Sequence, residues 1–375
     1  MTENKKEEKA YEPISKEDNF ETKSKGFFLQ NKKNIFVLLG IIILLCLFVC
    51  GLLLFNHSNS FQKVPSCGDG TFCNSCSLVK PYYCNSGKLI LNASACGCPK
   101  NFTSSENSCT NKFFANPKNV SFVYYLNGKK GEINLTLYSR ISKYLDNLPN
   151  TITYYGKEVP RLDDLELKRI ENPIQTQALM PLLISIENIA PNSTIDQLKI
   201  AISLVQNIPS GGTALAPVFG GKYQVSLARY PYQVLYYDNA SCEGKSELLA
   251  FLSKKIGYKT ALFYYPKQNH ESVGISCPLE YSLNSSGYCF IETTAPAPIS
   301  YSTGNYIGAI NLPLNNPKII LLGTGMNLPQ NLTDYSDSKT LSRILKRNKM
   351  TGRSNYFQRK TLKKISKRYN LNYIL

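Results

Sequence analysis

The chain is poor in the side chains that build metal and cofactor sites. Its 375 residues include two histidines, four methionines and no tryptophan. His57 closely follows an apolar run, so imidazole chemistry elsewhere in the chain depends on His270. One usable histidine with scattered carboxylates gives no zinc-type ligand cluster, and the sequence contains no glycine-rich phosphate-binding loop. We therefore expect no metal, no nucleotide and no other cofactor.

The chain also has a single long apolar run, Ile35–Phe55. Its length matches a single membrane-spanning helix, and no small-residue cleavage site follows it. Residues 1–34 are polar and rich in lysine, which predicts a disordered tail on the cytoplasmic side. We interpret residues 35–55 as a signal anchor in the bilayer of the cell membrane, with the main domain outside the cytoplasm.

Cysteines and glycosylation acceptor sites are absent before this run. Acceptor sites of the N-x-S/T type occur at Asn56, Asn92, Asn101, Asn119, Asn134, Asn192, Asn239, Asn284 and Asn331. Glycans and disulfides are typical of extracytoplasmic chains. Both distributions therefore favour a disulfide-bonded glycoprotein on the outer side of the membrane.

Residues 56–111 form a cysteine-rich module. Its cysteines are Cys67, Cys73, Cys76, Cys84, Cys96, Cys98 and Cys109. A segment of this size buries little core, so crosslinks must stabilise it. The spacing Cys73-x-x-Cys76 leaves zinc as an alternative, but the lack of histidine and the oxidising compartment favour disulfides. The odd count leaves one cysteine unpaired or paired elsewhere. We expect a spacer, with ligand binding as the alternative.

Residues 112–330 are predicted to form the main α+β domain. Val120–Tyr125 and Glu132–Tyr138 are expected strands around an Asn-Gly turn. Ile195–Ile208 has the apolar periodicity of an amphipathic helix and follows a capping serine. Ser210–Gly221 is rich in glycine and proline, which predicts a loop.

A thiol, an imidazole and a carboxylate follow in this domain, each beside a predicted element. Cys242 precedes an amphipathic helix that ends at Gly257, and the free amides and dipole of a helix N-terminus favour a thiolate. His270 opens the second of two strands, and Glu292 lies in a third. A thiol needs a base to act as a nucleophile, and an imidazole needs an acid that fixes its tautomer. Cys242, His270 and Glu292 are therefore the candidate catalytic residues.

This order of a helix-borne Cys, a strand-borne His and a strand-borne acid followed by Thr resembles the transglutaminase-like core of the papain-type cysteine enzymes. The resemblance extends over residues 112–328 and includes Tyr230–Leu235, which is similar to the segment that leads into the cysteine. It implies an α+β core in which the helix of Cys242 packs on an antiparallel sheet that carries the His and the acid. The family usually has Asp in place of Glu292 and a Trp as oxyanion donor, which leaves the Cys242 backbone N–H for that role here.

The resemblance implies acyl transfer from a peptide or glutamine amide through a thioester on Cys242. Water as acceptor gives a peptidase or amidase, which we favour because hydrolysis needs no second polypeptide site. A lysine amine as acceptor gives a protein-crosslinking transglutaminase. The expected partner is a protein or peptide substrate at the cell surface. A non-catalytic surface-binding module that retains the fold is the alternative of a different class.

Cys277 and Cys289 lie at facing ends of the two strands that carry His270 and Glu292. A disulfide between them would hold base and acid in register. We therefore expect these two cysteines to pair and Cys242 to stay free.

Residues 331–375 form a basic C-terminal tail. Ser338–Leu375 contains twelve Lys or Arg and no Asp or Glu, in a chain of net charge +17. Such a run is typical of a solvated or disordered surface. Attraction to anionic lipids or surface polymers is the alternative, and nucleic acid fits an external domain poorly.

Overall fold

The computed structural model describes residues 40–48, 66–149, 151–155, 163–211, 215–218, 222–226, 228–265, 268, 270–302 and 317–371. The chain divides into two compact units, Met1–Val64 and Pro65–Leu375. In the first unit residues 40–48 are helical, and the rest of the expected signal anchor lies outside the described residues. Among the helices that are described, none has the length and hydropathy needed to cross a membrane.

A four-stranded antiparallel sheet forms the centre of the second unit. Its strand order is β12 (Tyr288–Ile291), β11 (His270–Ser276), β10 (Thr260–Tyr265) and β13 (Lys318–Leu321). The predicted α+β class is confirmed, and β10 and β11 lie where the sequence predicted strands.

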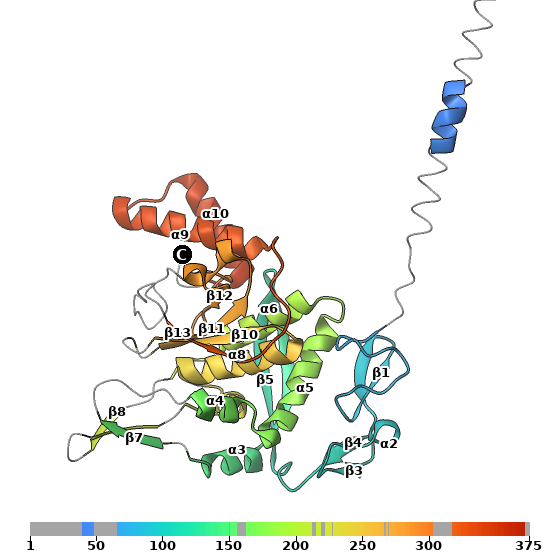
Figure 1. Ribbon diagram of the computed structural model, residues 1–375, viewed down its shortest axis with the longest axis vertical. Helices are drawn as coiled ribbons and strands as arrows, with labels where there is room; N and C mark the ends of the chain where they lie inside the picture. The colour runs from blue at the N-terminus through green and yellow to red at the C-terminus, as the bar shows by residue number, and fades with distance from the viewer. Residues whose placement is uncertain are drawn as a thin grey trace, which may run out of the picture. The chain divides into compact units, whose positions relative to one another are not determined.

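Both faces of this sheet are covered, which explains why β10 is buried along its whole length. On one face Leu262 and Val273 pack against a group of helices. These helices are α5 (Pro173–Ile189), α6 (Thr194–Asn207) and α8 (Cys242–Ile256). On the other face Phe263 and Phe290 pack against α9 (Thr333–Thr351) and α10 (Tyr356–Tyr369). The sheet therefore lies between two helical layers (Figure 1).

The basic C-terminal segment is folded, so the expectation of a disordered tail is wrong, whereas most of its lysines and arginines do lie on a solvated surface. Helix α9 buries Leu341 and Ile344, and helix α10 buries Leu362 and Ile365, each pair at the i, i+3 spacing of one helix face. These side chains join the second core of the domain. The domain therefore extends past residue 330.

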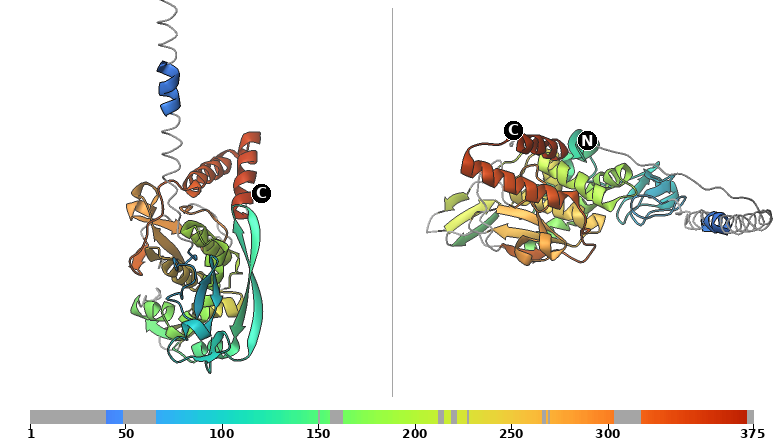
Figure 2. Two further views of the ribbon diagram at one scale, coloured as in Figure 1. Left: turned by 90° about the vertical axis from the view of Figure 1, so that its right-hand side faces the viewer. Right: turned by 90° about the horizontal axis from the view of Figure 1, so that it is seen from above.

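The predicted strands around Asn127-Gly128 are confirmed as β5 (Pro117–Leu126) and β6 (Lys129–Tyr138). Both turn residues have positive φ, 53° and 79°, as a two-residue hairpin turn requires. The hairpin of β5 and β6 runs along the edge of the unit, and its turn lies beside α10 (Figure 2), where the backbone of Lys367 lies against Gly128. The predicted helix of residues 195–208 is also confirmed, as α6.

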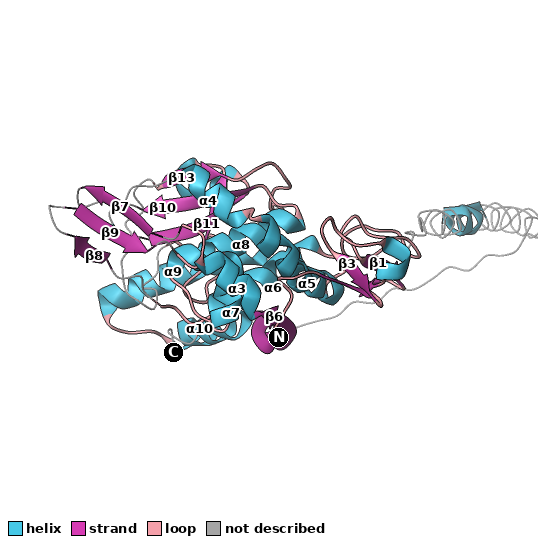
Figure 3. Cartoon of the chain, turned by 90° about the horizontal axis from the view of Figure 1, so that it is seen from below, coloured by secondary structure: helices cyan, strands magenta, loops and turns pink. Residues whose placement is uncertain are grey.

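A three-stranded sheet has the order β7 (Thr151–Tyr155), β9 (Lys222–Ser226) and β8 (Leu215–Val218). The prediction of a loop over Ser210–Gly221 is therefore wrong at β8. Three further helices are α3 (Ser139–Asp146), α4 (Asp163–Ile170) and α7 (Pro231–Tyr237). Figure 3 shows the helices gathered between this sheet and the strands of the cysteine-rich module.

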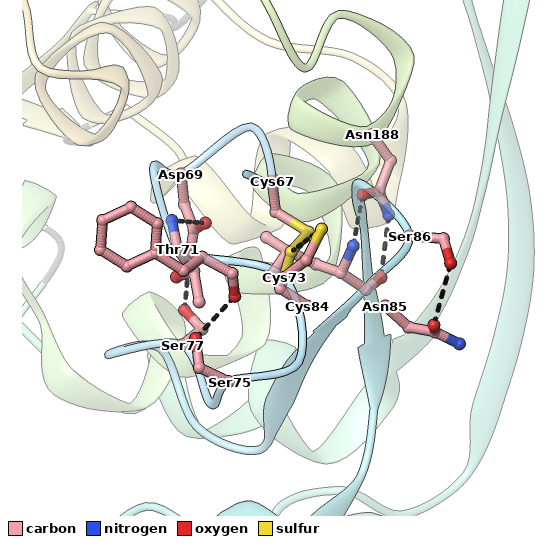
Figure 4. The surroundings of a disulfide bond; sticks show 12 residues. Cys67, Asp69, Thr71, Cys73, Ser75, Ser77, Cys84, Asn85, Ser86 and Asn188 are labelled. Carbon is pink, nitrogen blue, oxygen red and sulfur yellow. Dashed lines mark hydrogen bonds between the residues drawn. A yellow bond between two sulfur atoms is a disulfide. The ribbon is translucent and has the colours of Figure 1, made fainter. Parts of the chain in front are cut away.

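The cysteine-rich module contains short elements joined by disulfides. The elements are β1 (Tyr82–Asn85), β2 (Lys88–Leu91), α2 (Ala93–Cys96), β3 (Thr103–Ser105) and β4 (Ser108–Thr110). The disulfides are Cys67–Cys84, Cys76–Cys96 and Cys98–Cys109. The zinc alternative is wrong, because Cys76 is oxidised. Cys73 is the odd cysteine, and its Sγ lies 3.8 Å from Sγ of Cys84 (Figure 4).

The module packs on helix α5. The Asn188 side chain accepts a hydrogen bond from the Leu89 N–H (2.8 Å) and donates one to the Leu89 carbonyl (3.0 Å). Ile184 belongs to the same apolar cluster as the Cys67–Cys84 disulfide. The module and the main domain are therefore held together by packing as well as by the chain.

Candidate active site

Helix α8 positions the candidate nucleophile. Cys242 is its first residue, and Ser241 is the N-cap, whose side chain accepts from the Gly244 N–H. Gly257 ends the helix with φ of 107°. A buried apolar face fixes the helix against the sheet, so Cys242 is held at the positive end of the helix dipole. Cys242 is half-buried and forms no disulfide.

His270 lies between the other two candidate residues. It is the first residue of β11, where it pairs with Tyr265. Its Nε2 lies 3.4 Å from Oε2 of Glu292, and the Cys242 side chain lies close enough to raise the pKa of His270 by hydrogen bonding and charge. Because Nε2 faces the carboxylate, Nδ1 is the nitrogen that remains for the thiol. The structure therefore brings all three predicted residues together in one order, thiol, imidazole and carboxylate.

The carboxylate of Glu292 is fully buried and held at one oxygen. Its Oε1 accepts from the N–H of Thr293 (3.0 Å), the N–H of Thr294 (2.8 Å) and the hydroxyl of Thr294. Oε2 faces His270. Burial alone favours the neutral acid, but His270 and the bonds from Thr294 lower the pKa of Glu292 below its usual value. The acid therefore stays ionised beside the imidazole.

The environment of His270 favours the imidazolium. Burial lowers its pKa, but the hydrogen bonds and charges of Cys242 and Glu292 outweigh burial and raise the pKa to about 10. At neutral pH the ring is therefore an imidazolium, with a proton on both nitrogens. Protonated His270 is a counter-ion for a thiolate and a proton donor for a leaving amine.

Lys245 is a site residue that the sequence did not reveal. It lies on α8 one turn after Cys242 and is fully buried. Its ammonium donates to the Ile208 carbonyl (2.6 Å) and, at 3.4 Å, to the Thr294 carbonyl. Burial lowers the pKa of Lys245 to about 8, although the charges of Glu292 and Cys242 oppose this shift. The amine therefore adds a buried positive charge that interacts with the Glu292 carboxylate.

Further buried hydrogen bonds fix the segment that follows β12. Gln206 Nε2 donates to the Glu292 carbonyl (2.8 Å). The hydroxyls of Ser246 and Thr293 lie 3.0 Å apart, and Ser246 Oγ also donates to the carbonyl of Glu271. Helix α6 therefore holds the carbonyl of Glu292 and helix α8 holds the side chain of Thr293, which preorganises the acid.

The Cys277–Cys289 disulfide that the sequence predicted is present. Cys289 pairs with Ile275 across β11 and β12, and Cys277 follows β11 directly. The crosslink therefore ties the strand of His270 to the strand that leads into Glu292.

A cluster of three glutamates on and beside helix α8 has the spacing of a metal site. Within the described part of the chain, the carboxylates of Glu166, Glu243 and Glu247 lie within 4.8 Å of one another. The buried guanidinium of Arg169 forms an ion pair with Glu247 at 3.1 Å and stacks on Tyr230. We assign the group to this ion pair, because the arginine already compensates the buried negative charge.

No protein-family model matches the chain, and neither the curated proteins nor the solved structures contain a match to it. The case for a function therefore depends on the chemistry of the residues described above.

Proposed function

We propose that this protein is a thiol enzyme that transfers an acyl group through a thioester on Cys242, as in the transglutaminase-like core that it resembles. One observation carries the proposal. Side chains from α8, β11 and the end of β12 meet with the imidazole between the thiol and the carboxylate. That is the arrangement needed to activate a nucleophile, fix the tautomer of its base and stabilise the imidazolium.

The reaction starts when Cys242 Sγ attacks the carbonyl carbon of an amide. The C–N bond breaks, His270 gives its proton to the leaving amine, and a thioester forms. His270 then takes a proton from water while the hydroxide oxygen attacks the thioester, which releases a carboxylic acid and restores Cys242. Glu292 keeps the imidazole oriented through both steps. In this proposal the backbone N–H of Cys242, the first amide of α8, binds the oxyanion.

We favour hydrolysis of peptide or amide bonds at the outer surface of the cell membrane. An amine in place of water would join two polypeptides in the same second step. The two reactions differ in their products, because hydrolysis of a glutamine amide adds about 1 Da and an amine acceptor adds its own mass less ammonia.

The first test is alkylation of the unit Pro65–Leu375 with iodoacetamide across pH, with peptide mapping of each cysteine. We expect Cys242 to react rapidly below pH 7 and His270→Ala to slow it at least tenfold, because the imidazolium is then absent. Cys73 provides an internal reference in the same sample. A Cys242 rate equal to that of Cys73, and unchanged by His270→Ala, would contradict the proposal.

The second test measures turnover on peptide and glutamine amides, with and without an amine acceptor. Cys242→Ser is the matched control, because it keeps the site's shape and removes the thiol. Activity that survives this substitution would remove Cys242 as the nucleophile. An alkylatable Cys242 without turnover on any amide would instead favour the surface-binding alternative.

A further inference from the structure

Helices α9 and α10 form a basic hairpin, defined here as residues 333–369. Its lysines and arginines include Arg368, which is paired with Asp337, and eleven exposed residues. The exposed ones are Lys339, Arg343, Lys346, Arg347, Lys349, Arg353, Arg359, Lys360, Lys363, Lys364 and Lys367. No acidic residue follows Asp337 in the chain. The hairpin therefore presents a dense positive surface.

The fold concentrates this charge instead of dispersing it. Several exposed residues are four apart on one helix, as in Arg343 and Arg347 or Lys360 and Lys364, where like charges repel and destabilise the helix. The buried apolar stripe of each helix keeps the hairpin on the sheet despite this repulsion. An anionic partner would relieve the repulsion, because it would bring counter-charge to a rigid platform.

The ends of the two helices that meet at their connecting turn add a second feature. Met350, Tyr356 and Phe357 are 78%, 67% and 77% exposed. The two rings pack edge to face at 5.6 Å, so they form one apolar projection. Lysine and arginine flank it on both sides. Aromatic and apolar side chains beside basic residues are typical of segments that lie at the surface of a bilayer.

We infer that the basic hairpin binds the surface of a membrane that contains anionic lipid. The lysines and arginines contact headgroup phosphates, and Met350, Tyr356 and Phe357 enter the boundary between headgroups and acyl chains. The apolar tip favours a bilayer over nucleic acid or an anionic polysaccharide, because those polyanions offer no apolar layer to receive a methionine. This inference is independent of the proposed enzymatic activity.

The test is sedimentation of the unit Pro65–Leu375, which has its own cores and disulfides, with phosphatidylcholine vesicles with or without phosphatidylserine. This unit lacks residues 35–55, so binding reports on the rest of the chain. We expect binding to the anionic vesicles, loss of binding at high salt, and at least a tenfold weaker affinity after Lys360→Glu, Lys363→Glu and Lys364→Glu together. Screening of charge explains the salt effect.

The matched control reverses three exposed lysines of the cysteine-rich module, Lys80, Lys88 and Lys100. It makes the same change in net charge, and we expect at most a small effect. Phe357→Ser is a separate variant that leaves the core and the charges intact, and we expect weaker binding to vesicles with unchanged binding to heparin. Equal losses in both triple variants, no effect of Phe357→Ser, or binding to heparin without binding to vesicles would overturn the inference.

Discussion

Glu187 provides a direct test of how the cysteine-rich module is attached to the main domain. This glutamate of α5 is 5% exposed, and its Oε2 has no hydrogen-bond partner among the described residues. The module covers it, because a Cβ on Gly68 would lie 2.6 Å from the Glu187 carbonyl oxygen. Burial, followed by the charge of Asp69, raises the pKa of Glu187 to about 8.

The sign of the resulting pH dependence follows from linkage. In the unfolded chain Glu187 titrates near its usual value of 4.5. Between these two values the folded protein holds a proton that the unfolded chain has lost, so stability falls as pH rises. Each pH unit costs up to about 1.4 kcal/mol, which gives about 2 to 4 kcal/mol between pH 5 and pH 8 when partial solvation is allowed for.

Glu187→Gln removes this titration and keeps the shape of the side chain. We expect urea unfolding at pH 8 to show a gain of about 2 to 4 kcal/mol over the wild type, and at pH 5 a difference of about 1 kcal/mol or less. The contributions of the other titrating groups to the pH dependence are the same in the wild type and the variant, so they cancel when the two are compared. Glu106→Gln, an exposed change within the module, is the control and should have no effect at either pH. Equal differences at pH 5 and pH 8 would refute a buried, protonated Glu187.

Three further predictions concern the site. Lys245→Met leaves the buried Ile208 carbonyl without its hydrogen bond and the Thr294 carbonyl with Ser210 as its remaining donor. It should cost about 2–4 kcal/mol in urea unfolding and slow the alkylation of Cys242; an unaffected alkylation rate would show that the charge does not reach the thiol. Glu292→Gln removes an anion that raises the pKa of His270, so the alkaline limit of turnover should fall by about 1–3 pH units, and an unchanged limit would contradict the ion pair. Cys277→Ser should lower the urea midpoint by an amount equivalent to about 3 kcal/mol. When the wild type and the variant are both measured in reductant, their midpoints should be the same.

The elements that carry the site could be predicted because local signals agree. Helix α8 combines an N-cap serine, apolar residues on one face and a C-terminal glycine. Strand β11 follows Pro266–Asn269, whose residue types favour a turn. The Asn127-Gly128 turn is equally local, since both residues adopt positive φ readily. Local signals of this kind fix where an element begins and ends. They are sufficient to predict that Cys242 lies at the start of a helix and His270 at the start of a strand.

The parts that escaped prediction depend on distant contacts. Lys245 looks like a solvent-facing charge on an amphipathic helix, and the carbonyls that it satisfies, Ile208 and Thr294, come from elsewhere in the chain. The basic hairpin hides its apolar stripe, because most positions between Leu341 and Ile365 are polar or basic. In both cases burial depends on distant parts of the chain, and the residue pattern of a single helix does not show such contacts.

Glu292 stands where the resemblance described above would place an Asp, and the backbone that follows Glu292 holds this longer side chain. A longer acid has one more rotatable bond, and an unanchored carboxylate would hold the imidazole loosely. Here the amides of Thr293 and Thr294 and the Thr294 hydroxyl hold Oε1, so the added freedom is removed. Gln206 and Ser246 fix the backbone that supplies those donors. The site therefore obtains its rigidity from the strand end, and the extra methylene does not argue against an orienting role for the acid.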